Sequence, residues 1–250
     1  MSISSKIVDD VIASGIDFVT TVPCKQLAGV IDEVETRQGI YHIPSNKEDE
    51  GMGLCAGAFM GGKKPMIIMQ NTAIGVTINT LATLTQFYRM PRAGGLPGRD
   101  GGAHKSAAQP DADPDLPLSQ RSGCRGAAGD PELHLHVQQT RGDPDGCVLL
   151  GRLWRPMIRS EILREIAPIL RDQLVVCNIG LPSQELHMID DQPTNFYMLG
   201  TMGLSSSIGL GLELAQNKTV ISIDGDGSVL THLGTLPTIA TNVADNFILL

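Results

Sequence analysis

Residues 220–228 read Val-Ile-Ser-Ile-Asp-Gly-Asp-Gly-Ser, an apolar run that leads directly into an acidic, glycine-rich turn. A short apolar run of this kind, bounded by Asp and Gly, is typical of a buried strand. An aspartate at the carboxyl end of a strand can present its carboxylate to Mg²⁺, and the flanking glycines let backbone amides approach a diphosphate. An ordinary Asp-Gly turn is the alternative, but the position directly after a strand favours a metal–diphosphate site.

Strand and helix patterns alternate on both sides of this motif. The strand patterns cover residues 18–22, 40–44, 66–70, 174–178, 196–199, 220–224 and 246–250. The helical patterns cover residues 4–15, with Ser4 or Ser5 as the N-cap, and then 27–34, 48–60, 74–88, 158–170, 204–215 and 230–240. This alternation predicts an α/β protein, with parallel sheets wrapped by helices and ligands at the carboxyl ends of the strands.

Residues 91–155 break the alternation. They contain no Ile, Phe, Tyr, Asn or Met, whereas the other 185 residues hold 22 Ile. Because neither a strand nor a helix period is visible there, we expect a disordered segment. Such a long loop is unusual inside a small domain, and Gly, Ala, Arg and Pro are the residues that GC-rich codons encode. Our hypothesis is a shifted reading frame that is restored near Pro156, which translation of the parent DNA in the other two frames would test.

The chain then divides into three parts. Residues 1–90 and 157–250 are two parallel-sheet modules, both incomplete, and residues 91–156 are an irregular Gly/Pro/Arg-rich connection. A chain of 250 residues has room for one large domain or two ordinary ones.

Composition argues against several classes of partner. The formal net charge is −8 and only 4% of the residues are aromatic, so we expect neither nucleic acid nor a membrane surface as a partner. No stretch has the length of a membrane span, and the first residues lack the apolar core of a signal peptide. The five cysteines show no zinc-site spacing, and we expect reduced thiols in a cytoplasmic protein.

Two further glycine-rich stretches each begin a predicted helix. Residues 199–211, Leu-Gly-Thr-Met-Gly-Leu-Ser-Ser-Ser-Ile-Gly-Leu-Gly, would let a helix start approach a flat ligand closely. Residues 46–57, Asn-Lys-Glu-Asp-Glu-Gly-Met-Gly-Leu-Cys-Ala-Gly, place three acids in a first helical turn, where they also favour the helix dipole. The second stretch nearly matches a dinucleotide fingerprint, but it has one residue too many before its last Gly, and its acids would repel a pyrophosphate. A nicotinamide oxidoreductase is therefore the weaker alternative.

Together these stretches resemble the thiamine-diphosphate-dependent decarboxylases. An acid lies nine residues before Gly57, Gly-x-Met-Gly follows at 200–203, and Gly-Asp-Gly-Ser at 225–228 follows a strand. Within that family the chain is similar to the fused form of the sulfopyruvate decarboxylases of coenzyme M biosynthesis, with the phosphonopyruvate decarboxylases as close relatives. The resemblance implies a pyrimidine-binding module, a diphosphate-binding module, and a homo-oligomer with sites between subunits. The implied reaction converts 3-sulfopyruvate to sulfoacetaldehyde and CO₂.

The resemblance also implies roles for single residues toward the cofactor's aminopyrimidine ring. Glu48 matches the glutamate that hydrogen-bonds this ring and so activates the cofactor, which is general acid–base work. The carbonyl of Gly200 would accept a hydrogen bond from the pyrimidine amine. The side chain of Met202 would hold the cofactor in its bent form.

Other residues match the diphosphate end and the substrate. Asp226 would bind Mg²⁺. By the same resemblance, the diphosphate would be held by Gly225, Gly227 and Ser228. Lys25 and Asn71 lie at predicted strand ends, from which they would meet a small anionic 2-oxo acid. For Lys25 an ordinary solvated lysine is an equally good interpretation.

The sequence departs from the family pattern at one point. The family's metal motif ends with an Asn at the end of the next strand, whereas here 24 residues follow Asp226, and Asn242 and Asn246 come too early. We therefore expect weak cofactor binding and little turnover from this sequence alone, with a noncatalytic fragment or subunit as the alternative. Sulfopyruvate and phosphonopyruvate both carry an anionic group beyond the keto acid, so the sequence leaves this choice open.

Overall fold

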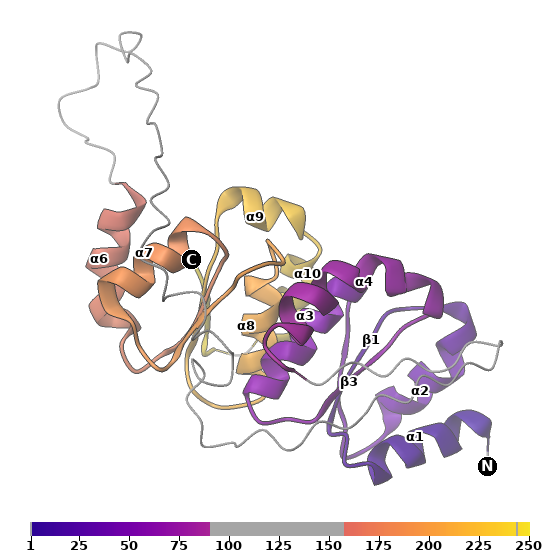
Figure 1. Cartoon of the computed structure of the whole chain (residues 1–250). Coiled ribbons are helices and arrows are strands. Elements are labelled where there is room, and N and C mark those ends of the chain that lie inside the picture. Colours follow the sequence, from indigo (N-terminus) through magenta and orange to yellow (C-terminus); the bar gives the residue numbers. More distant parts are fainter. Residues whose placement is uncertain (1, 91–157, 244) are drawn as a thin grey trace.

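The strands form two separate parallel sheets, as the computed structural model shows for residues 2–90, 158–243 and 245–250 (Figure 1). The first sheet has the order β2-β1-β3, with β1 at Phe18–Thr21, β2 at Tyr41–Pro44 and β3 at Pro65–Ile68. The second has the order β5-β4-β6-β7, with β4 at Leu174–Cys177, β5 at Asn195–Tyr197, β6 at Val220–Ile223 and β7 at Phe247–Leu249. The predicted α/β class with parallel sheets is confirmed. The hypothesis of a shifted frame concerns residues that lie outside the described ranges.

Helices connect the strands in both halves. The first half contains α1 (Ile3–Ala13), α2 (Ala28–Thr36), α3 (Glu48–Met60) and α4 (Ile74–Thr80), with 3₁₀ turns at Lys25–Leu27 and Asn71–Ala73. The second half contains α6 (Arg159–Leu170), α7 (Leu181–Asp190), α8 (Ser205–Glu213), α9 (Asp226–Thr231) and α10 (Thr235–Asn242).

Two helix boundaries in the first half differ from the predictions. The N-cap of α1 is Ser2, whose hydroxyl accepts from the amide of Ser5 at 3.0 Å, rather than Ser4 or Ser5. The predicted helix 74–88 is divided, because α4 is followed by a π-helical segment at Leu81–Gln86.

Two features of the second half also differ. The predicted helix 230–240 is in fact two helices, because the acidic turn itself starts α9 at Asp226 and the chain turns near Gly234 before α10. Helix α7 was not among the predicted helices, although a proline stands in its first turn, which is a common helix-start signal.

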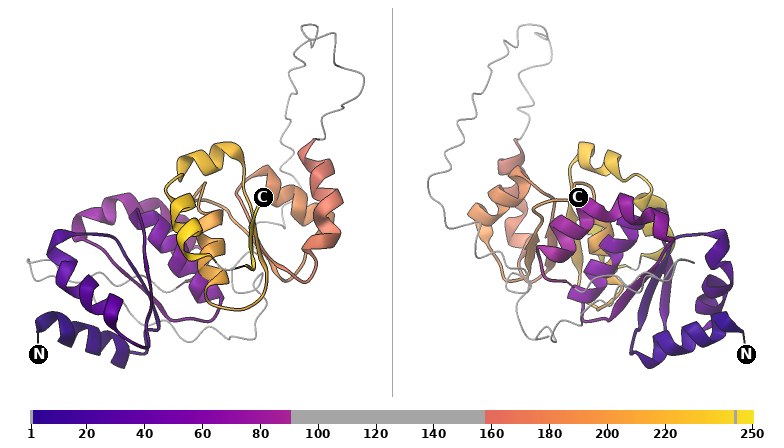
Figure 2. Two further views of the ribbon diagram at one scale, coloured as in Figure 1. Left: turned by 180° about the vertical axis from the view of Figure 1, so that it is seen from behind. Right: turned by 45° about the vertical axis from the view of Figure 1, so that its right-hand side comes forward.

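Each sheet is covered by helices on both faces (Figures 1 and 2). In the first half, Val8 of α1 and Val30 of α2 pack with Val19 on one face, and Leu54 of α3 packs with Phe18 on the other. In the second half, α6 and α7 contribute Leu163, Leu170 and Leu186 to one face, and α8 contributes Ile208 and Leu212 to the other. Burial on both faces explains why the strands are continuous apolar runs.

The two halves meet where α3 packs against α8 (Figure 2). Almost every residue of both helices is buried. A Cβ placed on Gly57 would strike the carbonyl oxygen of Ile208, and one on Gly211 would strike the backbone of Leu54. These two glycines are therefore required for the close approach of the two helix backbones.

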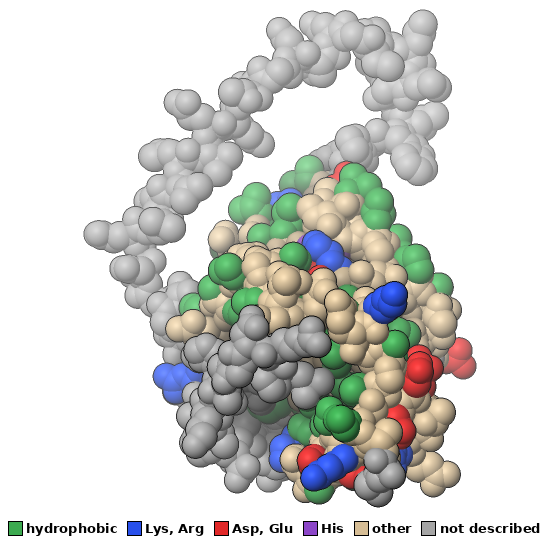
Figure 3. Space-filling view, turned by 90° about the vertical axis from the view of Figure 1, so that its right-hand side faces the viewer, with side chains coloured by type: hydrophobic (Ala, Val, Ile, Leu, Met, Phe, Trp, Pro, Cys, Tyr) green, Lys and Arg blue, Asp and Glu red, His purple; other side chains and the backbone are tan. Residues whose placement is uncertain are grey.

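The surface of the described ranges is chemically mixed. On the side that carries α1 and α2, hydrophobic, basic and acidic side chains lie among one another (Figure 3). In the part of the chain that the structure describes, no helix combines the length and apolar character that a bilayer crossing requires.

Candidate active site

The start of α3 holds three acids, of which Glu48 is half-buried and the next two are buried. The carboxylate of Asp49 accepts hydrogen bonds from Lys47 Nζ at 2.9 Å and from His232 Nε2 at 3.0 Å. Burial by itself would raise the pKa of Asp49, but the hydrogen bonds and charges of His232 and Lys47 outweigh it and lower the pKa to about 2. Asp49 is therefore a carboxylate at neutral pH.

Glu50, the third acid, lies in a different environment. One carboxylate oxygen accepts from the amide of Asn46 at 2.9 Å, and the other is buried with no hydrogen-bond partner among the described residues. Burial raises the pKa of Glu50, although hydrogen bonds from Thr238 and the amide of Asn46 partly oppose this. The side chain of Asn46 donates to the carbonyl of Gly234 at 2.6 Å and lies 2.8 Å from the Thr238 hydroxyl, which ties the start of α3 to α10.

The second half contributes the turn at residues 200–203, directly before α8. Thr201 and Gly203 both have positive φ, at +59° and +90°, so the turn is tight. Gly200 packs against the side chain of Thr83, which follows α4, so closely that a Cβ would not fit. Met202 is 46% exposed, and its carbonyl accepts from the Thr231 hydroxyl at 3.2 Å. The two residues predicted to meet the aminopyrimidine thus lie on a turn that is held from both halves.

Asp224, the first residue of the acidic turn after β6, holds the turn in place by accepting two hydrogen bonds. The hydroxyl of Ser205 donates to Asp224 Oδ2 at 2.5 Å, and the amide of Gly225 donates to Asp224 Oδ1 at 3.0 Å. Asp226 is exposed, begins α9, and accepts from the amide of Gly227 at 2.8 Å. Asp224 therefore has a structural role, and the carboxylate of Asp226 faces solvent.

The residues of this turn fit a diphosphate with Mg²⁺. The hydroxyl of Ser228 is buried and has no hydrogen-bond partner in the described part of the chain. A Cβ placed on Gly225 or Gly227 would meet no atom within 4 Å. Asp226 is a hard oxygen ligand, and Mg²⁺ in proteins commonly combines one carboxylate with phosphate oxygens and water. Within the described ranges no three His, Cys, Asp or Glu side chains gather closely enough to hold a metal ion.

Asn178 extends the same edge of the sheet and was not singled out from the sequence. It follows β4, and its backbone amide donates a hydrogen bond to the carbonyl of Ile223 on the neighbouring strand at 2.9 Å. Its side-chain oxygen is buried and has no partner among the residues described. The signal that could have identified it is its position directly after an apolar strand, at the edge where an α/β sheet binds its ligands.

Lys25 and Asn71 lie on neighbouring turns at the carboxyl ends of β1 and β3, and both are exposed. The two turns touch through Cys24 Sγ and Gln70 Oε1, which are 3.6 Å apart. The structure therefore brings these two predicted residues to one edge of the first sheet.

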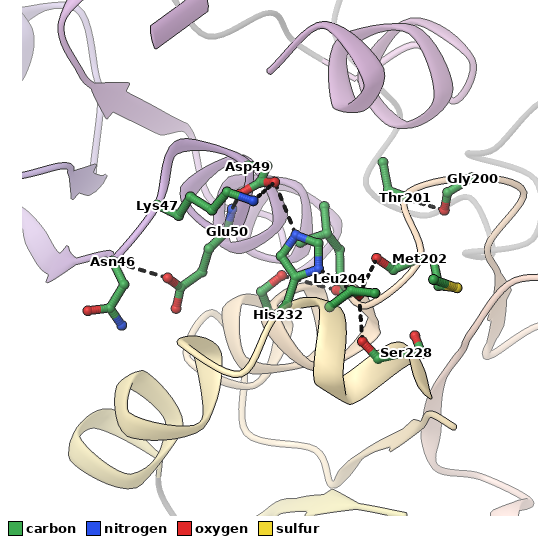
Figure 4. A network of polar contacts seen from close by, with 12 residues as sticks. Asn46, Lys47, Asp49, Glu50, Gly200, Thr201, Met202, Leu204, Ser228 and His232 are labelled. Carbon is green, nitrogen blue, oxygen red and sulfur yellow. Dashed lines mark hydrogen bonds and ion pairs between the residues drawn. The ribbon is translucent and has the colours of Figure 1, made fainter. Parts of the chain in front are cut away.

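A network of polar contacts joins the two halves of the candidate site within one chain (Figure 4). Asp49 contacts His232, and a Cβ placed on Gly203 would strike Thr231, His232 and the carbonyl of Ser228. The start of the helix that carries Glu48 therefore lies beside the turn that carries Met202. Asp49, Thr231 and His232 were not predicted, because their role depends on contacts between residues far apart in the sequence.

Known proteins resemble this chain along its length. The family "Thiamine pyrophosphate enzyme, C-terminal TPP binding domain" matches residues 179–250. Sulfopyruvate decarboxylase of Methanosarcina acetivorans is 30% identical over 98% of this chain and 74% of its own length. In Methanococcus maripaludis, sulfopyruvate decarboxylase subunit beta is 54% identical over 38% of this chain and 51% of its own length. Subunit alpha from the same organism is 40% identical over 36% of this chain and 54% of its own length. Phosphonopyruvate decarboxylase of Streptomyces viridochromogenes is 28% identical over 94% of this chain and 69% of its own length.

The chain thus covers about three quarters of one relative and about half of each subunit. The matched thiamine pyrophosphate domain includes the acidic turn after β6. The chain belongs to the family of thiamine-diphosphate-dependent decarboxylases that includes sulfopyruvate decarboxylase.

Proposed function

We propose that the chain decarboxylates 3-sulfopyruvate to sulfoacetaldehyde and CO₂ with thiamine diphosphate and Mg²⁺, as a step of coenzyme M biosynthesis. The observation that carries the proposal is the contact between Asp49 and His232 at 3.0 Å. This contact places the start of α3, with Glu48, beside the 200–203 turn and α9 in a single chain. The similarity to sulfopyruvate decarboxylase over 98% of the chain supports the choice of substrate.

In this proposal Glu48 holds the aminopyrimidine ring of the cofactor by a hydrogen bond. The carbonyl of Gly200 accepts a hydrogen bond from the amine of that ring, and the side chain of Met202 supports the bent form of the cofactor. The half-buried position of Glu48 strengthens such a hydrogen bond, because partial exclusion of water raises electrostatic interactions. When it is bound, thiamine diphosphate supplies the electron sink that takes up the electron pair left by CO₂.

At the other end of the site, Asp226 provides the carboxylate for Mg²⁺. The residues we assign to the diphosphate are Gly225, Gly227 and Ser228. Because the amide of Gly227 donates to Asp226 in this structure, binding of the diphosphate requires that this amide turn toward a phosphate oxygen. The hydroxyl of Ser228 is already without a partner in the described ranges.

Phosphonopyruvate is the alternative substrate. Both acids carry an anionic group beyond the keto acid, and we assign Lys25 and Asn71 to that group in either case. Over nearly the whole chain the identities are similar, 30% to sulfopyruvate decarboxylase and 28% to phosphonopyruvate decarboxylase. The sulfopyruvate proposal is favoured by the 54% identity to a sulfopyruvate decarboxylase subunit over 38% of this chain.

The proposal includes a homo-oligomer with sites between subunits, in the cytoplasm. The two named subunits of the enzyme from Methanococcus maripaludis are consistent with subunit assembly in this family. The cysteines in the described ranges, Cys24, Cys55 and Cys177, are free thiols, as expected of a reducing compartment.

Calorimetric titration with thiamine diphosphate, at fixed Mg²⁺, tests the cofactor, and CO₂ release from the two candidate acids tests the substrate. We expect binding that requires Mg²⁺, and faster CO₂ release from sulfopyruvate than from phosphonopyruvate. Glu48→Gln keeps the size of the side chain and should lower kcat at least about a hundredfold, the usual contribution of an acid–base group. Binding without turnover of either acid would instead favour a noncatalytic subunit, and no binding would contradict the proposal.

A further inference from the structure

His232 lies at the centre of the contact between the two halves. Its side chain is only 13% exposed. Its Nε2 atom is 3.0 Å from Asp49 Oδ2, and its Nδ1 atom is 3.1 Å from the hydroxyl oxygen of Thr231. Figure 4 shows the ring between the start of α3 and the turn that carries Met202.

A count of protons defines the state of this ring. Asp49 is an acceptor only, so Nε2 must carry a proton to bond it. The Thr231 hydroxyl has a single proton, and its oxygen is 2.6 Å from the carbonyl oxygen of Ser228. Two oxygens at that distance require a proton between them, so Thr231 donates to a carbonyl. Its oxygen is then the acceptor for Nδ1, and both ring nitrogens are donors.

The charges around the ring agree with this count. Asp49 faces it as a carboxylate, and Lys47 lies on the far side of Asp49, 2.9 Å from the same carboxylate oxygen. Glu50 is the next acid along the same helix. A positive ring therefore faces a buried carboxylate, whose other cationic partner, Lys47, is half exposed.

Thr231 connects the ring to the cofactor turn. Its one proton is shared between the carbonyl oxygen of Ser228 at 2.6 Å and that of Met202 at 3.2 Å, and the longer branch is the one that reaches the turn. The turn at 200–203 needs such support, because Thr201 and Gly203 both have positive φ and Met202 is 46% exposed. If Nδ1 lost its proton, Thr231 would turn its own proton to the ring and release the carbonyls.

We propose that His232, held as an imidazolium between Asp49 and Thr231, is a positioning residue that fixes the Met202 turn relative to the start of α3. One consequence rests on the proposed function, namely that His232 affects the affinity for thiamine diphosphate. The proton count and the anchoring of the turn concern the chain without cofactor.

The first test uses the full chain without cofactor, labelled with ¹⁵N in its six histidines, at pH 7.5. His232→Gln identifies the signal of this ring by its loss. We expect both ring nitrogens to be protonated, and Asp49→Asn to remove the second proton. A neutral ring in the unmodified chain would overturn the proposal.

Hydrogen exchange of the amides at 202–204 tests the anchoring. We expect His232→Gln and Thr231→Val each to speed exchange about tenfold, the usual effect of losing one hydrogen bond, and Thr231→Ser to leave it unchanged. His187→Gln is the matched control, because His187 on α7 pairs with Asp191 at the end of that helix, away from this cluster. Unchanged exchange in both His232→Gln and Thr231→Val would overturn the proposal. Should His232→Gln not fold, Thr231→Val still decides the anchoring.

Titration with thiamine diphosphate and Mg²⁺ then tests the consequence. We expect His232→Gln to raise Kd about tenfold, with Thr231→Ser close to the unmodified chain. If the unmodified chain binds no cofactor, the proposed function fails, whereas the ring protons and the exchange rates still decide the role of His232.

Discussion

Asp49 and Glu50 are adjacent acids whose pKa values shift in opposite directions. Both side chains are buried, and burial alone disfavours the charged form of each. Asp49 has two cationic partners, which lower its pKa to about 2, whereas Glu50 has only neutral donors, so its pKa is raised. The difference arises from the orientation of successive residues in one helical turn, with Asp49 toward α9 and Glu50 toward α10.

Asp49→Asn should destabilise the chain in a pH-dependent manner. The pKa of Asp49 is lowered from the ordinary 3.8 to about 2, so its stabilising contribution is complete above pH 4 and is lost as the pH falls through 2. We expect the variant to lose about 2 kcal/mol of unfolding free energy at pH 7, from the loss of a charged partner for His232 and Lys47.

Urea unfolding at pH 7 and pH 3 measures this difference, and it should shrink at the lower pH. Asp32→Asn, on the exposed side of α2, is the control and should change the free energy by less than about 0.5 kcal/mol. Equal stability of Asp49→Asn and the unmodified chain at pH 7 would mean that the contacts of Asp49 with His232 and Lys47 make no net contribution to the unfolding free energy.

Single residues of the site differ in how far the sequence predicts them. Glu48 and Asp226 belong to local patterns, a spacing of nine to Gly57 and a turn after an apolar strand, and the structure makes each the first residue of a helix that follows a strand. The pair of Asp49 and His232 joins positions 183 residues apart. No local period or motif relates such positions, because their contact exists only after the two halves have packed.

At the scale of elements, the central strands β1, β4 and β6 were predicted well because every residue of each is buried between the helical layers. The helix ends were less predictable. The break between α9 and α10 follows from the His232 backbone, at φ −136° and ψ 45°, which ends α9. Apolar residues continue across this break, so the periodicity of 230–240 gave no sign of it.

The packing of α3 on α8 depends on glycines, and Gly57→Ala tests this. A methyl group at Gly57 would strike the carbonyl oxygen of Ile208, and a backbone atom cannot move aside cheaply. We expect a loss of about 2 kcal/mol or more in unfolding free energy, because the two helices must separate or tilt.

Gly75→Ala is the matched control for that prediction. Gly75 also lies inside a helix, but a Cβ there would meet no atom within 4 Å. Alanine favours a helix over glycine, so this variant should gain up to about 1 kcal/mol. Thermal unfolding of both variants gives the comparison. A similar gain in both would show that α3 and α8 do not pack closely in solution.

At the scale of the whole molecule, two layered α/β halves are joined through a closely packed helix contact and one buried tyrosine. Tyr88 belongs to the first half, yet it packs in the core of the second with Phe196 and Met198. Composition and periodicity predicted the two halves, but they contain no information on which helix faces the other half. That choice depends on the match between the small residues of α3 and those of α8.

Tyr88→Phe should weaken both the contact between the two halves and the binding of the cofactor. The Tyr88 hydroxyl donates to the carbonyl of Tyr197 at 2.8 Å and accepts from the amide of Leu199 at 2.9 Å, just before Gly200. Phenylalanine keeps the ring in the core but leaves both backbone groups without this partner, at a cost of about 1–3 kcal/mol. Since Gly200 is one residue further along the same backbone, the affinity for thiamine diphosphate should fall as well. Tyr41→Phe is the control, because Tyr41 is 45% exposed and its ring stacks on Phe18, away from Gly200. Unfolding free energy and cofactor Kd are measured on both variants. A loss of stability in Tyr88→Phe with unchanged Kd would show that Tyr88 stabilises the contact between the halves but does not affect cofactor binding.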